Sequence, residues 1–207
     1  MRLIFLTLIL MGTPRSFAHT PKDGDIYATA GSMLYRTDTM HHQFESPYLL
    51  APGVMAEADL DSHGGVEVAV FYLRNSFAVG DQGSLYIERV KRMDIATGYR
   101  YWFQPWISAG ILFSSTYAMG RAQVIRDDFK GGPHRGTSAS DITEYGFDGS
   151  LKFEPWQSGR LGLVIDTHYN YSVTPKKGED SNHYGIFVGL KYFLQSREKR
   201  PPLATDE

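Results

Sequence analysis

Apolar and polar residues alternate with a period of two along eight segments of this chain, a pattern typical of half-buried β-strands. We predict strands over 25–35, 53–61, 65–73, 85–103, 106–118, 140–153, 160–173 and 183–194. Beyond the first eighteen residues, no apolar stretch reaches the roughly eighteen residues that a membrane-spanning helix needs. The sequence therefore predicts an all-β protein and excludes a bundle of membrane helices.

The connections between these segments alternate between short and long. Tight turns are predicted at 62–64, 104–105 and 154–159, and longer polar connections at 36–52, 74–84, 119–139 and 174–182. In an up-and-down barrel this alternation gathers the tight turns at one end and the long loops at the other. We therefore predict an eight-stranded antiparallel up-and-down transmembrane β-barrel.

The ends of the chain differ from the predicted barrel. Met1 and Arg2 precede an apolar run, and Ser16 and Ala18 are the small residues of a cleavage site, which indicates a signal peptide over residues 1–18. Residues 195–207 carry charges and two adjacent prolines, which predicts a disordered periplasmic tail. The barrel is thus expected over 19–194. With no cysteine in the sequence, an exported chain has no disulfide scaffold.

Each predicted strand has one apolar and one charged face. In the segment 53–61, Val54, Ala56 and Leu60 alternate with Glu57 and Asp59. Such charges either face solvent around an apolar lumen, as in a soluble lipocalin-like barrel, or face inward beneath a lipid-facing surface. The polar faces contain many glycines, which suit a crowded lumen, and this favours the second arrangement.

Aromatic residues gather at the ends of the apolar faces. An interfacial girdle is expected to include Tyr99, Tyr101, Trp102, Phe103, Trp106, Phe153 and Trp156.

With these features the sequence resembles the small eight-stranded bacterial outer-membrane barrels, the class of the OmpA transmembrane domain, OmpX and OmpW. The last segment also resembles the signal by which that class reaches the barrel-assembly machinery, with alternating Ile186, Val188, Leu190, Tyr192 and Leu194. The class usually ends on a terminal Phe, whereas this chain continues to Glu207, so the signal would be internal.

Charges that face inward must be paired, because an unpaired buried carboxylate is costly. Arg92 is one candidate base, and the rest of the predicted lumenal network is Glu57, Asp59, Glu67, Asp94, Arg100, Glu144, Asp148, Lys152, Asp166, His168 and Lys191. Because eight strands enclose only enough space for side chains, we expect a filled lumen and no large pore.

The sequence contains candidate residues for two other kinds of site, a catalytic site and a metal site. Some small outer-membrane barrels modify lipid A with a His and a Ser, but His168 and Ser172 lie about 13 Å apart along one strand, too far for a hydrogen bond. In the predicted loops, His41, His42 and Glu45, and His134 with Asp127 and Asp128, match no metal motif. We therefore predict no catalytic residues, no metal and no cofactor.

The expected location is the outer membrane of a diderm bacterium, and the expected role is structural or surface interaction. A net charge of −2 without a basic stripe excludes a nucleic-acid partner. The expected partners are outer-membrane lipids and lipopolysaccharide, with phosphates held by Arg74, Arg126, Lys130, Arg135, Lys176 and Lys177, and the assembly machinery during biogenesis. We expect a monomer. The alternatives are a lipid A-modifying enzyme of the outer leaflet and a soluble periplasmic ligand-binding barrel.

Overall fold

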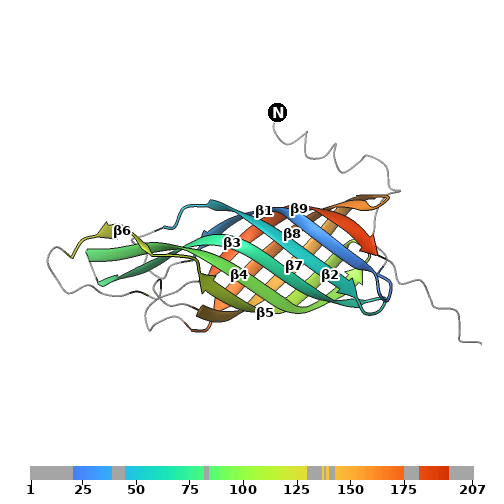
Figure 1. The fold of residues 1–207 in the computed structure, drawn as a ribbon, viewed down its shortest axis with the longest axis horizontal. Coiled ribbons are helices and arrows are strands. Elements are labelled where there is room, and N and C mark those ends of the chain that lie inside the picture. The colour runs from blue at the N-terminus through green and yellow to red at the C-terminus, as the bar shows by residue number, and fades with distance from the viewer. Residues whose placement is uncertain are drawn as a thin grey trace, which may run out of the picture.

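The computed structural model describes residues 21–38, 45–81, 84–129, 137, 139, 143–174 and 182–195. The chain forms a closed antiparallel barrel of eight strands, ordered β3-β2-β1-β9-β8-β7-β5-β4 and closed by pairing of β3 with β4 (Figure 1). The strands are β1 (Ile26–Thr37), β2 (Leu49–Asp59), β3 (Gly64–Asp81), β4 (Ser84–Gln104), β5 (Ile107–Ala118), β7 (Thr143–Ser158), β8 (Leu161–Ser172) and β9 (His183–Gln195). The predicted up-and-down barrel is confirmed.

No helix in the described ranges is long and apolar enough to cross a membrane. The predicted signal peptide, residues 1–18, and residues 196–207 of the predicted tail lie outside the described residues.

The prediction of a long loop over 74–84 is wrong. Strand β3 runs to Asp81 and β4 begins at Ser84, and Arg74 to Asp81 pair residue by residue with Lys91 to Ser84. This long hairpin extends beyond the rest of the barrel at the end opposite the tight turns (Figure 1). Its polar residues Asn75 and Ser76, which suggested a loop, are buried.

A short ninth strand, β6 (Gln123–Asp127), was not expected. It lies in the connection after β5 and pairs antiparallel with Tyr86 to Arg89 of β4. Asp128 adds two contacts with Leu85: its carboxylate accepts the Leu85 amide at 3.1 Å and its own amide donates to the Leu85 carbonyl at 3.0 Å. The loop end of β3 and β4 is thereby extended into a three-stranded projection.

The tight turns lie at one end of the barrel. One connects β2 and β3 through 60–63, and another connects β4 and β5 through 105–106. The third is narrower than predicted, because β7 continues through a bulge at 153–156 to Ser158 and turns at Gly159, whose φ is +57°. Strands β1 and β9 meet at this end, where Ile26 pairs with Gln195.

The barrel wall separates two environments. Side chains of one parity, including Leu34, Val54, Ile111 and Leu151, point outward and are exposed, whereas those of the other parity are buried inside. The interior is therefore the packed core of the molecule, as expected for an eight-stranded barrel.

Candidate functional site

Two interior cations form the centre of a buried ion-pair cluster. Lys152 of β7 donates to Glu57, and to Glu67 Oε2 at 2.8 Å. Arg100 of β4 makes a two-pronged contact with Glu67, through Nε at 2.5 Å and Nη2 at 3.0 Å, and its Nη2 reaches Asp166 Oδ2 at 3.1 Å. These five side chains are almost inaccessible to solvent. Such pairs must be fully hydrogen-bonded to offset the loss of hydration.

The strand register explains why these groups meet. Glu57 and Glu67 are direct cross-strand partners on β2 and β3, and Lys152 and Asp166 are partners on β7 and β8. Because β2 and β7 are four places apart in the ring of eight strands, Lys152 crosses the lumen to reach Glu57. A like-charged pair on one wall is thus neutralised from the opposite wall.

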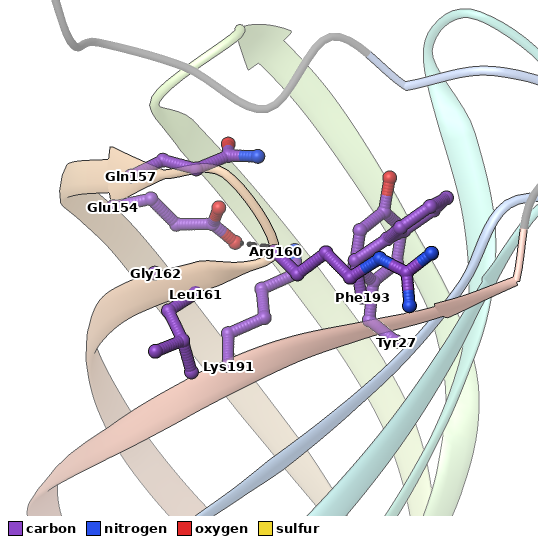
Figure 2. A pocket seen from close by; sticks show the side chains of 8 residues that line it. All are labelled: Tyr27, Glu154, Gln157, Arg160, Leu161, Gly162, Lys191 and Phe193. Carbon is purple, nitrogen blue, oxygen red and sulfur yellow. Dashed lines mark hydrogen bonds and ion pairs between the residues drawn. The ribbon is translucent and has the colours of Figure 1, made fainter.

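A second cluster lies nearer the tight-turn end. Lys191 of β9 donates to Glu154 at 2.7 Å and lies 3.5 Å from Glu57, which links it to the central cluster. Its ammonium group also lies 4.3 Å from the ring centroid of Tyr27 and 5.1 Å from that of Trp102. Figure 2 shows Lys191 and Glu154 between the strand walls, where a small pocket is lined by Tyr27, Gln157, Arg160, Leu161, Gly162 and Phe193.

Trp102 corrects one sequence prediction. It was expected in the outer aromatic girdle, but its side chain is 2% exposed and lies inside the barrel over Lys191. Tyr101 and Phe103 on either side point outward, so the alternation of a strand directs Trp102 inward. Glu154 is a buried carboxylate that was not predicted, because the sequence pattern over 154–159 indicates a turn.

The remaining predicted network residues lie apart from the central cluster or at its outer edge. His168 Nδ1 contacts Asp148 at 3.0 Å, and its Nε2 lies 3.5 Å from Asp166. Arg92 pairs with Glu144 at 2.7 Å and lies over the ring of Phe77. Asp94 accepts from Thr116 at 2.6 Å. Asp59 is buried at the tight-turn end, where it accepts the Lys22 amide at 3.4 Å.

An apolar cluster in the interior was not predicted. Phe71 packs edge-on against Phe187 and His168, with ring centroids 5.7 Å and 5.2 Å apart. The same cluster includes Met33, Tyr35, Ala51, Met55, Ala69, Leu73, Ala96, Leu112 and Val164. The signal in the sequence that could have predicted this cluster is the inward parity of these residues, which they share with the charged residues on the same faces.

In the described part of the chain, His168 and Ser172 contact different carboxylates. His168 contacts carboxylates, while the Ser172 hydroxyl lies 3.4 Å from Glu144. Glu45 pairs with Arg36 at 3.4 Å, and Asp128 with Arg126 at 2.7 Å. His41, His42 and His134 lie outside the described residues. Among the residues that are described, no group of three His, Asp or Glu side chains is placed to hold a metal ion.

The outer face of the barrel is covered by apolar side chains. Of the predicted girdle, Tyr99, Tyr101, Phe103, Trp106 and Trp156 are exposed, and Phe153 is half-buried. The five residues of the predicted assembly signal, Ile186, Val188, Leu190, Tyr192 and Leu194, all lie exposed on this face. Tyrosines also occupy it near the loop end, at Tyr72, Tyr117, Tyr145, Tyr169 and Tyr171. This second aromatic band was not predicted.

Comparison with known proteins finds similarity in fold only. No family model matches the chain, and no curated protein matches it. Among solved structures, the outer-membrane protein OprG from Pseudomonas aeruginosa is similar with a TM-score of 0.57 and 10% identity, over 85% of this chain and 98% of that one. Ail of Yersinia pestis, solved with the heparin analogue sucrose octasulfate, matches with a TM-score of 0.48 and 15% identity, over 83% of this chain and 98% of that one.

The chain has the fold of a small outer-membrane β-barrel. Its apolar exterior and charged interior are the reverse of a soluble barrel, so the lipocalin-like alternative is wrong. A surface this apolar is stable against lipid, and a closed barrel leaves no unpaired strand edge there. The barrel is therefore an integral protein of the outer membrane.

Proposed function

We propose that this outer-membrane barrel has a structural or surface-interaction role, is not an enzyme, and has a lumen closed by its own side chains. The contact that carries this proposal is the one from Lys152 on β7 to Glu57 and Glu67 on the opposite wall. A side chain that spans the lumen and pairs on the far side leaves no continuous aqueous path at that level.

The groups next to this contact support the same proposal. Toward the tight-turn end, Lys191 and Glu154 fill the lumen, and toward the loop end the Phe71 and Phe187 rings do so. Ion pairs therefore occupy the lumen toward the tight-turn end, and aromatic rings occupy it toward the loop end.

The proposed partners are the lipids and lipopolysaccharide of the outer membrane. During biogenesis, the proposed partner is the barrel-assembly machinery, which would bind the outward-facing residues of β9 from Ile186 to Leu194. We propose a monomer with no cofactor and no nucleic-acid partner. The projection formed by β3, β4 and β6 is the part best placed to meet other surface molecules (Figure 1).

Two sets of measurements test this function, one for the location and folding of the barrel and one for the closed lumen. The expressed protein should be found in the outer-membrane fraction and should migrate faster on gels before boiling than after, because closed barrels stay folded in SDS until heated. Reconstituted into a planar bilayer, it should give no stable conductance steps, and vesicles that contain it should not swell in neutral sugars. Stable steps with the intact chain would contradict the closed lumen.

A further inference from the structure

We propose that Arg74, Lys91 and Arg89, on the outer face of β3 and β4, form a binding site for the phosphate groups of an anionic lipid in the outer leaflet. This inference rests on the outer-membrane function proposed above and names a specific site for one of its partners. Only Arg74 of this set was expected from the sequence.

The first observation is a like-charged pair. Arg74 and Lys91 are direct cross-strand partners, and both side chains are exposed on the outer face. Arg89 is two residues from Lys91 on the same face and lies opposite Ser76. Like charges directly opposite each other destabilise a sheet unless a counter-charge lies between them. A bound anion would therefore relieve the repulsion between these three neighbouring cations.

The second observation is that the residues described around this site do not supply the anion. The nearest positions of the same parity on these two strands are Tyr72, Met93 and the buried Ser76, and none is acidic. Within the described ranges, neither Arg74 nor Lys91 makes an ion pair, and Arg89 only donates to the Ser76 hydroxyl at 3.2 Å. Arg36 and Arg126 differ from these three cations, since Arg36 pairs with Glu45 and Arg126 with Asp128.

The third observation is the level of the site. Tyr72 and Met93 form the cross-strand pair next to Arg74 and Lys91, with Val70 and Ile95 beyond them, all on the outer face. Adjacent pairs on one face are about 7 Å apart along the strand. The cations thus begin where the lipid-facing apolar surface ends, and the phenol of Tyr72 marks that boundary.

This position favours a lipid phosphate over a soluble anion. A lipid anchored by its acyl chains holds its headgroup at this depth, next to cations fixed on paired strands. Guanidinium groups suit phosphate oxygens because they donate in a planar, two-pronged geometry. The ligand class is therefore a phosphorylated lipid, such as the phosphorylated glycolipid of an outer leaflet.

The test compares the purified full chain with the double variant Arg74→Gln/Lys91→Gln. Binding is measured to detergent micelles that contain phosphorylated lipid A, to the same micelles with the dephosphorylated lipid, and to inorganic phosphate alone. The matched control is Arg160→Gln, which removes an exposed cation at the tight-turn end. Heat-modifiable gel migration is recorded for every variant, so that loss of the barrel is distinguished from loss of the site.

The expected result is a loss of affinity for phosphorylated lipid of about tenfold or more in the double variant, and no change in the control. Binding should also weaken steeply with salt. Equal affinity in the double variant, equal binding of the dephosphorylated lipid, or binding of inorganic phosphate without the lipid would each overturn the proposal. If instead the intact chain showed no heat-modifiable barrel in the outer membrane, the proposed function itself would fail.

Discussion

The hydroxyl of Tyr35 on β1 both accepts the backbone N–H of Arg74 and donates to its carbonyl oxygen on β3, the latter at 3.1 Å. Strand β2 lies between these two strands, but it pairs with β3 only as far as Gly53 and Phe71. A buried side chain thus replaces the backbone partner that β2 does not provide. At that level, the Tyr35 hydroxyl links β1 directly to β3.

We therefore expect Tyr35→Phe to destabilise the barrel by about 1–3 kcal/mol, because the backbone groups of Arg74 would lose their partner. Urea unfolding of the protein in lipid vesicles measures this loss. Tyr145→Phe, which alters an exposed tyrosine on the lipid-facing surface, is the control and should be neutral. A Tyr35→Phe protein as stable as the control would show that water replaces the hydroxyl without cost.

The central cluster predicts a larger effect. Lys152→Leu should cost about 3–5 kcal/mol, because Glu57 and Glu67 would face each other without their shared cation. The temperature at which folded migration is lost on gels should fall accordingly. The double variant Lys152→Leu/Glu57→Gln should recover part of the loss, because it removes one of the two carboxylates that Lys152 pairs with.

Asp148→Leu provides an independent test of the same network, since it removes the carboxylate that contacts His168 Nδ1. It should also destabilise the barrel without changing lipid binding at the outer face. Unchanged thermal stability of both Lys152→Leu and Asp148→Leu would refute a stabilising network in the lumen.

One glycine is required by the space around it. Gly31 pairs with Gly189 across β1 and β9, and a Cβ at position 31 would lie 2.2 Å from the Val188 carbonyl oxygen and 2.8 Å from the Phe187 ring. Gly31→Ala should therefore destabilise the barrel by roughly 1–3 kcal/mol. Gly149→Ala is the matched control, because nothing lies within 4 Å of a Cβ there. Comparable unfolding midpoints for the two variants would contradict this close packing.

The turn between β2 and β3 predicts a dependence on pH. The amides of His63 and Gly64 donate to Asp61 Oδ1 at 2.6 Å and 2.8 Å, and these hydrogen bonds lower the pKa of the Asp61 carboxyl below its ordinary value of 3.8. Because the folded-state pKa is the lower one, the stabilisation is fully present above the unfolded-state value. It is lost as the pH falls through the folded-state pKa.

Hydrogen exchange of the His63 and Gly64 amides between about pH 2 and pH 5 would check this dependence. Once corrected for intrinsic exchange rates, protection should fall on acidification in the natural chain. In Asp61→Asn the side chain does not titrate, so protection should stay constant across that range. A parallel fall in both proteins would assign the effect to another group.

The sequence predicted which residues face inward better than it predicted the contacts that they make across the lumen. Alternation separates the two faces because each strand has lipid on one side and protein on the other, and it located Glu57, Glu67, Lys152 and Asp166 correctly on the inner face. It could not show that Lys152 crosses to Glu57, because that contact depends on which strands lie opposite each other in the closed ring.

The extended hairpin escaped prediction for a different reason. Residues 74–81 are polar enough to suggest a loop, but they pair with β4 beyond the barrel, and Thr137 and Ala139 from a distant loop pack near them. Such coverage depends on contacts between residues far apart in the chain. Composition along a single segment contains no information about it.

The link between Lys191 and Glu57 has a consequence for the order of folding. Lys191 is on β9, the last strand to be synthesised, and Glu57 is on β2. Until β9 closes the ring, an inserting intermediate has interior charges that lack part of their final partners in a medium of low dielectric constant. We therefore expect partly inserted species to be short-lived. Closure of the ring should be the committing step of biogenesis, because β9 then brings the Lys191 cation to Glu57.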